Sequence, residues 1–210
     1  MNADTRPPLL AVALLSGAAL GYEVLLTRLL AIIQWHHFAH MIISLGLLGY
    51  GASGTFLALT GRRWQGRFLP VFAVNALLFG LTAVAAFLIA QQLPFNPLEI
   101  AWDRRQLGYL LALYLILAVP FFCVANALGL ALMAHTGEIA RIYAWDLLGA
   151  GVGACAVVGL LWLVPPLAAL QSIGVLGAAA ALLAVWAYAG PRRWLALTGL
   201  AVVLPLLLPV

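Results

Sequence analysis

The sequence is poor in charge and contains no lysine. Its six acidic and ten basic side chains amount to 8% of the 210 residues, whereas 66% of the residues are apolar. A soluble domain carries about 25% charged residues, because it needs a polar surface around its core. Nucleic-acid-binding proteins and disordered tails need dense charge, so both classes are excluded. The composition predicts an integral membrane protein that crosses the bilayer several times.

The sequence also lacks the signatures of soluble enzymes. It has no dinucleotide-binding glycine motif between a strand and a helix, no P-loop, no HExxH and no GxSxG. Its two cysteines, Cys123 and Cys155, lie in apolar segments and form no CxxC pair, so a disulfide is not expected. The chain therefore shows no catalytic motif of its own, and no cofactor is evident from its residues.

Long apolar segments predict seven membrane-spanning helices. A spanning helix needs about 20 apolar residues, whereas a spanning strand needs about 10 residues of alternating polarity. The segments here are long and do not alternate, which favours helices. The predicted spans are residues 8–34, 38–60, 68–91, 107–133, 143–164, 166–189 and 193–209. We expect one all-α domain over residues 1–210, a polytopic helical bundle embedded in the lipid bilayer.

Arginine is unevenly distributed among the connections, which predicts the orientation. With the N-terminus in the cytoplasm, seven arginines lie inside and two lie outside, as the positive-inside rule requires. The cytoplasmic set is Arg6, Arg62, Arg63, Arg67, Arg141, Arg192 and Arg193, and the external pair is Arg104 and Arg105. The net charge of +4 therefore reports orientation and does not indicate a nucleic-acid partner.

Glu23 is the most informative ionisable residue, because it lies in the middle of the first predicted span. It stands about ten residues from the outer end, hence about 15 Å deep. A central charge costs about 2.5–3.5 kcal/mol, so Glu23 is expected to face a polar cavity, to be paired or to be protonated. Arg28 lies about 140° further around the helix, which argues against a direct Glu23–Arg28 pair. A structural network and a ligand or proton site both remain open.

Histidines cluster at the turn into the second predicted span. His36 and His40 are four residues apart, so on a helix both imidazoles project from one face, as a metal or proton site requires. Glu99 or Asp103, on the same side of the membrane, is a candidate third ligand. The alternative is a set of ordinary interfacial histidines without a metal.

Asp146 stands near the predicted cytoplasmic start of the fifth span. An acid in that position either stabilises the helix N-terminus through the dipole or serves as a functional acid in an inner vestibule. Three further polar residues, Asn75, Asn126 and Gln171, lie within other spans and are predicted to make contacts between helices.

Two segments resemble a known family. Residues 16–30, SGAALGYEVLLTRLL, resemble the opening helix of the membrane domain of bacterial spermidine synthase-like proteins, in which Ser-Gly, Tyr-Glu and Thr-Arg-Leu-Leu are typical. Residues 141–153, RIYAWDLLGAGVG, resemble a later segment of the same domain with its Tyr-x-x-Asp-x-x-Gly-Ala pattern. The resemblance is concentrated in about thirty residues, and the intervening spans fit the same plan.

This resemblance implies a multi-pass module of the bacterial inner membrane. In the family, such helices precede a soluble domain similar to polyamine aminopropyltransferases, which binds an S-adenosylmethionine-type donor. That domain is not within these 210 residues, so no transferase reaction is assigned to them. The resemblance implies substrate-binding roles for Glu23, Arg28 and Asp146. The module would anchor a cytoplasmic transferase domain or partner subunit, or present a cationic or membrane-resident substrate to it.

Two other functions fit parts of the sequence. A small amine transporter would use the mid-membrane acid Glu23 and a helix disturbed at Pro120. A metal-binding or redox membrane subunit would use His36 and His40.

Overall fold

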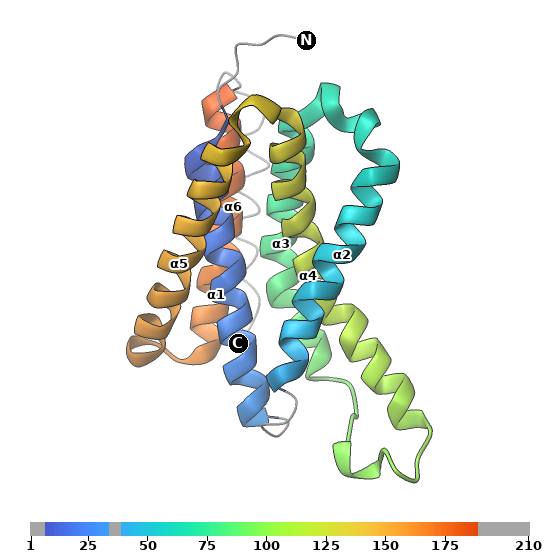
Figure 1. The fold of residues 1–210 in the computed structure, drawn as a ribbon. Helices are drawn as coiled ribbons and strands as arrows, with labels where there is room; N and C mark the ends of the chain where they lie inside the picture. Colours follow the sequence, from blue (N-terminus) through green and yellow to red (C-terminus); the bar gives the residue numbers. More distant parts are fainter. Residues whose placement is uncertain (1–6, 34–38, 189–210) are drawn as a thin grey trace.

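The computed structural model describes residues 7–33 and 39–188, which form an all-helical bundle (Figure 1). No strand occurs within these two ranges. The long helices are α1 (Leu9–Ile33), α2 (Ala39–Trp64), α3 (Phe68–Ala90), α4 (Arg105–Ala134), α5 (Ile139–Leu163) and α6 (Pro166–Tyr188). Short 3-10 turns, η2 (Gln65–Arg67), η3 (Pro97–Glu99) and η4 (Thr136–Glu138), lie in three of the connections.

All six long helices are long and apolar enough to cross a membrane, which indicates a multi-pass membrane protein. They correspond to the first six predicted spans. The predicted seventh span, residues 193–209, lies outside the described residues. Two ends differ from the prediction by four residues: α2 ends at Trp64 and not at residue 60, and α5 begins at Ile139 and not at residue 143. Asp146 is therefore two turns inside this helix, so a role at the helix N-terminus is wrong for it.

The helices alternate in direction along the bundle (Figure 1). We call the end that carries the start of α1 and the η4 turn the upper end, and the end that carries η3 the lower end. Helix α1 packs against α5, α6 and α2, while α3 packs against α4 and α6, and α2 packs against α4. Helix α1 thus lies at the junction between α5 and the rest of the bundle.

Glycines bring α1 and α5 unusually close together. A Cβ atom on Gly17 would lie 2.8 Å from the carbonyl oxygen of Gly149. A Cβ atom on Gly149 would overlap the backbone of Ala13, and one on Gly153 would overlap the backbone of Gly17. Small residues spaced four apart allow such contact between membrane helices. The backbone approach fixes the register of α5 along α1, with Gly149 at the level between Ala13 and Gly17.

Helix α5 otherwise lies at the periphery of the described bundle. Only Ile142 and Val157 among its residues are buried, because a single narrow face of the helix contacts α1. Large apolar side chains such as Leu148 and Val152 point outward and are more than 60% exposed. In a bilayer these side chains would contact acyl chains, which is the expected surface of an outer membrane-spanning helix.

The segment between α3 and α4 forms a hydrogen-bonded cap at the lower end. The amide of Gln106, which is buried, donates to Glu99 at 3.1 Å, and its side-chain oxygen accepts from the Asn96 backbone at 2.9 Å. The side chain of Asn96 also donates to Glu99 at 2.8 Å. These bonds occupy both carboxylate oxygens of Glu99, which makes it a structural residue of this cap.

Candidate functional site

The candidate site begins with a polar contact between α1 and α5. The hydroxyl of Ser16 donates a hydrogen bond to Oδ1 of Asp146. Ser16 is only 3% exposed, while Asp146 is half-buried. The contact depends on the glycine packing, because Ser16 precedes Gly17 and Asp146 lies one turn before Gly149. Asp146 is therefore directed towards α1, although most of its helix faces outward.

Glu23 lies on the same face of α1 as Ser16, two turns nearer the lower end. Seven residues separate the two, which places them about 10 Å apart along the helix axis. Glu23 is half-buried, and its Oε2 atom would lie 4.0 Å from a Cβ atom on Gly46 of α2. A Cβ at that distance would make only an ordinary van der Waals contact, so the Glu23 carboxylate lies beside α2 at the level of Gly46. Glu23 therefore faces a neighbouring helix.

Tyr50 of α2 lies near both acids without a hydrogen bond to either. It follows Gly46 by one helical turn, and its phenol lies within electrostatic range of both Asp146 and Glu23. Three helices thus contribute to one polar cluster, which we call the acidic site: Ser16 and Glu23 from α1, Tyr50 from α2 and Asp146 from α5. Its polar groups are two carboxylates and two hydroxyls, a set that suits a cationic ligand or protons.

No cation balances the acidic site within the described part of the chain. The ion pair found there joins Arg141 to Glu138 at 3.1 Å, on the exposed surface of the upper end. Neither Glu23 nor Asp146 makes an ion pair with a described residue. Since each charge held within a membrane costs about 2.5–3.5 kcal/mol, two unpaired carboxylates call for protons or a bound cation.

Arg28 does not belong to the acidic site in the structure. Its side chain is exposed on another face of α1 and lines a cavity with Trp162 of α5. Arg28 forms no ion pair with Glu23, in agreement with the angle of about 140° expected for five residues. The structure brings Glu23 and Asp146 to one cluster and places Arg28 in a second environment.

The predicted histidine site falls mainly outside the described residues. His36 and His37 lie there entirely, and His40 is described only as a backbone position in the first turn of α2. His135, at the upper end, packs edge-on against Phe68 at 5.0 Å and contacts the Ala131 carbonyl at 3.1 Å. Within the described ranges, no group of three or more His, Cys, Asp and Glu side chains is arranged to hold a metal ion.

The polar residues predicted between helices behave differently from one another. Asn126 accepts a hydrogen bond from the Ser53 hydroxyl at 2.8 Å, and this buried pair joins α2 to α4. Asn75 instead donates to the Val71 carbonyl of its own helix at 2.8 Å. Asn126 therefore makes the expected contact between helices, whereas Asn75 does not use its amide nitrogen in that way.

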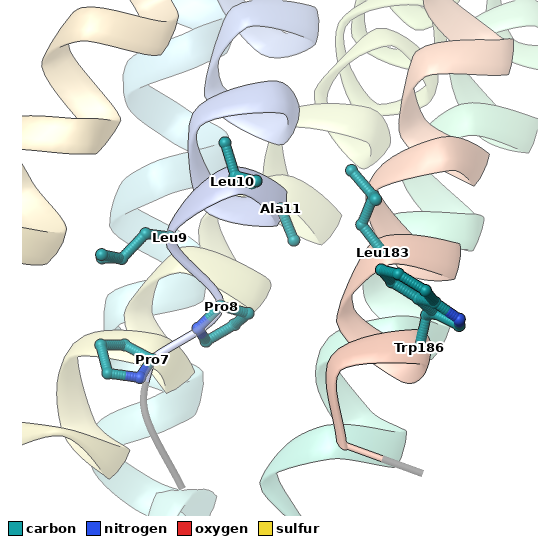
Figure 2. Close-up of a pocket in the computed structure, with 7 residues that line it drawn as sticks. All are labelled: Pro7, Pro8, Leu9, Leu10, Ala11, Leu183 and Trp186. Atoms are coloured by element: carbon teal, nitrogen blue, oxygen red, sulfur yellow. The ribbon is translucent and has the colours of Figure 1, made fainter. Parts of the chain in front are cut away.

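A cavity of about 390 Å³ lies at the upper end between the start of α1 and the end of α6 (Figure 2). Leu183 and Trp186 lie on one side of it and the first residues of α1 on the other. Its lining, Pro7, Pro8, Leu9, Leu10, Ala11, Leu183 and Trp186, contains no ionisable side chain. This cavity can hold apolar groups, but it supplies none of the chemistry of the acidic site.

Two members of the acidic site, Ser16 and Tyr50, were missed by sequence reasoning. For Ser16 a signal exists, because its spacing of seven from Glu23 places both side chains on one helical face. For Tyr50 no such signal exists, since nothing in the order of residues places that part of α2 beside two acids on other helices.

Comparison with known proteins adds no identification. No protein-family model matches the chain, and no curated protein or solved structure shows significant similarity to it. Function therefore has to be argued from the geometry and chemistry of the site.

Proposed function

We propose that this chain is a membrane module that binds an organic amine at the acidic site. The observation that carries the proposal is the convergence of Glu23 and Asp146 on one cluster without a cationic partner among the described residues. An ammonium group would supply the missing positive charge and would donate hydrogen bonds to the carboxylates. The hydroxyls of Ser16 and Tyr50 add acceptors for the remaining ammonium protons.

The arrangement favours an amine with two positive charges. Ser16 donates its hydrogen bond to Asp146, and Glu23 lies about 10 Å further along α1 than Ser16. One ammonium group therefore cannot contact both acids closely. A linear ligand with an ammonium group towards each end would pair with both. Such a ligand agrees with the polyamine chemistry implied by the resemblance to spermidine synthase-like proteins.

The proposal also specifies the membrane, the orientation of the module in it and the side on which the amine is presented. We place the module in the bacterial inner membrane with its upper end in the cytoplasm, because seven arginines then lie inside. Asp146 is the member of the site nearer the upper end, and Glu23 is the deeper one. An amine at Asp146 would thus be close to a cytoplasmic transferase domain or partner subunit that binds the S-adenosylmethionine-type donor.

The proposal is tested by amine binding to the purified full chain in nanodiscs. We expect spermidine to raise the unfolding temperature and to give saturable binding by calorimetry. Glu23→Gln and Asp146→Asn should each weaken binding about tenfold or more, since a charge-assisted hydrogen bond contributes about 1.5–3 kcal/mol. Glu138→Gln is the matched control, because Glu138 is exposed and paired with Arg141 away from the site.

Two results would contradict this function. If Glu138→Gln weakens binding as much as Glu23→Gln, the amine is attracted by general surface charge. If wild-type protein shows no saturable binding, the acidic site holds protons and no amine. Flux of labelled spermidine into proteoliposomes distinguishes a transporter from a module that presents the amine to a transferase. Transport by the wild-type protein that is lost in Glu23→Gln would favour the transporter.

A further inference from the structure

A second polar environment lies between α1 and α5 near the lower end. It is a cavity of about 380 Å³ whose lining is apolar except for one threonine and one arginine. The lining residues are Val24, Thr27, Arg28 and Ala31 of α1 with Val158, Leu161 and Trp162 of α5. We call it the Arg28 cavity. Here α1 and α5 no longer touch as closely as they do at Gly17 and Gly149.

The Arg28 cavity lies at the depth of a membrane interface. Arg28 stands five residues before the end of α1, about 8 Å from it, and Trp162 is the second-last residue of α5. Tryptophan is enriched at the level of lipid headgroups, and an arginine near a helix end extends its guanidinium towards that level. Two helices therefore place an interfacial aromatic ring and a cation in one cavity.

The cavity opens to the outer surface of the bundle. Val158 is 51% exposed and Trp162 is 87% exposed, and the side chain of Arg28 is exposed as well. Arg28 makes no ion pair or hydrogen bond with any residue that the structure describes. A cation near the hydrocarbon region needs an anionic partner, and phospholipid is the anion that surrounds a membrane-spanning helix at this depth.

We propose that the Arg28 cavity binds one phospholipid of net negative charge, with its phosphate on the guanidinium of Arg28 and no cationic headgroup to offset that pairing. The planar guanidinium donates two parallel hydrogen bonds to phosphate oxygens, a geometry that lysine cannot provide. The part of one acyl chain nearest the headgroup lies against Val158, Leu161 and Trp162. A free phosphate ion would make no favourable contact with these apolar side chains.

This inference is independent of the amine function, because it uses other residues of α1 and α5 and the opposite charge. It requires only that the chain spans a bilayer. Bound lipid at this position would fill the space where α1 and α5 separate and would hold their lower ends together. The acidic site lies on the same two helices, nearer the upper end.

Native mass spectrometry of the full chain tests the proposal. Delipidated protein is titrated with phosphatidylglycerol, phosphatidylcholine, and soluble glycerol phosphate. We expect one phosphatidylglycerol to bind at least tenfold more tightly than phosphatidylcholine, and glycerol phosphate not to bind. Arg28→Gln should remove that preference, whereas Arg105→Gln, which changes another arginine at the lower end, should keep it. Trp162→Ala should weaken both lipids about equally.

Several outcomes would overturn the lipid site. Equal competition by glycerol phosphate would show an anion site without a lipid contact. An unchanged preference in Arg28→Gln would show that the phosphate lies elsewhere, and a lipid-induced dimer would show an interface between copies of the chain. Arg28→Lys keeps the positive charge and serves as a second test if the glutamine variant fails to fold. The proposal requires that the lysine variant binds phosphatidylglycerol with intermediate affinity.

Discussion

Ser16 of α1 donates a hydrogen bond to the carboxylate of Asp146 of α5, across an interface in which glycine backbones touch. The two residues are 130 positions apart in the chain. The bond orients one carboxylate oxygen and leaves the other available to a ligand. It therefore connects the packing of two apolar helices directly to the chemistry of the acidic site.

Ser16→Ala should lower the free energy of unfolding by about 1–3 kcal/mol, because it removes a hydrogen bond to a charged acceptor. Ser172→Ala is the matched control, since the Ser172 hydroxyl donates at 2.9 Å to the Ala168 carbonyl of its own helix, and its loss should cost less than about 0.5 kcal/mol. Unfolding in micelles by a steric trap gives both values.

A double-mutant cycle identifies the origin of this loss. In an Asp146→Asn background, Ser16→Ala should have a smaller effect, because the charged acceptor is already absent. Equal losses for Ser16→Ala in the two backgrounds would mean that the serine contributes through packing alone.

Gly149→Ala should destabilise the protein by about 1–3 kcal/mol, because the added methyl group would overlap the Ala13 backbone. It should also reduce amine binding, since separating α1 from α5 breaks the contact between Ser16 and Asp146. Gly151→Ala adds the same methyl group on the same helix at a position with nothing within 4 Å. That variant should be neutral or up to about 1 kcal/mol more stable.

The comparison of these two glycine variants is decisive for the packing of α5. Thermal unfolding in nanodiscs and amine calorimetry are measured on both. If Gly151→Ala proves as harmful as Gly149→Ala, the face of α5 that contacts α1 has been assigned wrongly.

Tyr22→Phe should raise the free energy of unfolding by about 1 kcal/mol. Tyr22 is fully buried between Phe79 and Phe121, and its hydroxyl has no hydrogen-bond partner within the described residues. Removing an unsatisfied buried hydroxyl relieves the loss of its hydration. Tyr143→Phe, at a residue that is 56% exposed, is the control and should change nothing. A loss of stability in Tyr22→Phe would reveal a partner such as a buried water.

Cysteine labelling in intact cells tests the orientation. With Cys155, which is exposed, replaced by alanine, the buried Cys123 is the remaining native cysteine, and Leu98→Cys and Gly137→Cys each add one exposed thiol near the lower and upper ends. Leu98 is 58% exposed, and Gly137 has nothing within 4 Å. A membrane-impermeant maleimide should label Leu98→Cys from outside and Gly137→Cys only after lysis. The reverse pattern would place the N-terminus outside and invert the proposed direction of amine delivery.

Much of the fold follows from the order of residues alone. Six long apolar segments could only become membrane-length helices, because the hydrocarbon region leaves no other way to satisfy the backbone of an isolated segment. The depth of Glu23 within its helix follows from counting along the chain. The start of α5 does not, since the four residues Ile139 to Ile142 also belong to the helix, and Asp146 is therefore deeper than expected.

The composition of the acidic site was decided by the tertiary structure. The helices are apolar on nearly all sides, so no polar stripe marks which face of α1 meets α5 or which meets α2. Close contact at Gly17 and Gly149 brings Ser16 to Asp146, and the packing of α1 on α2 places the Glu23 carboxylate beside Gly46. A single sequence determines that Glu23 and Arg28 are embedded charges on different faces. Only helix packing determines that Glu23 lies near an acid of α5 and a tyrosine of α2, whereas Arg28 lines a separate cavity. The partners of each charge come from distant segments, and contact between helix backbones fixes the register of those segments.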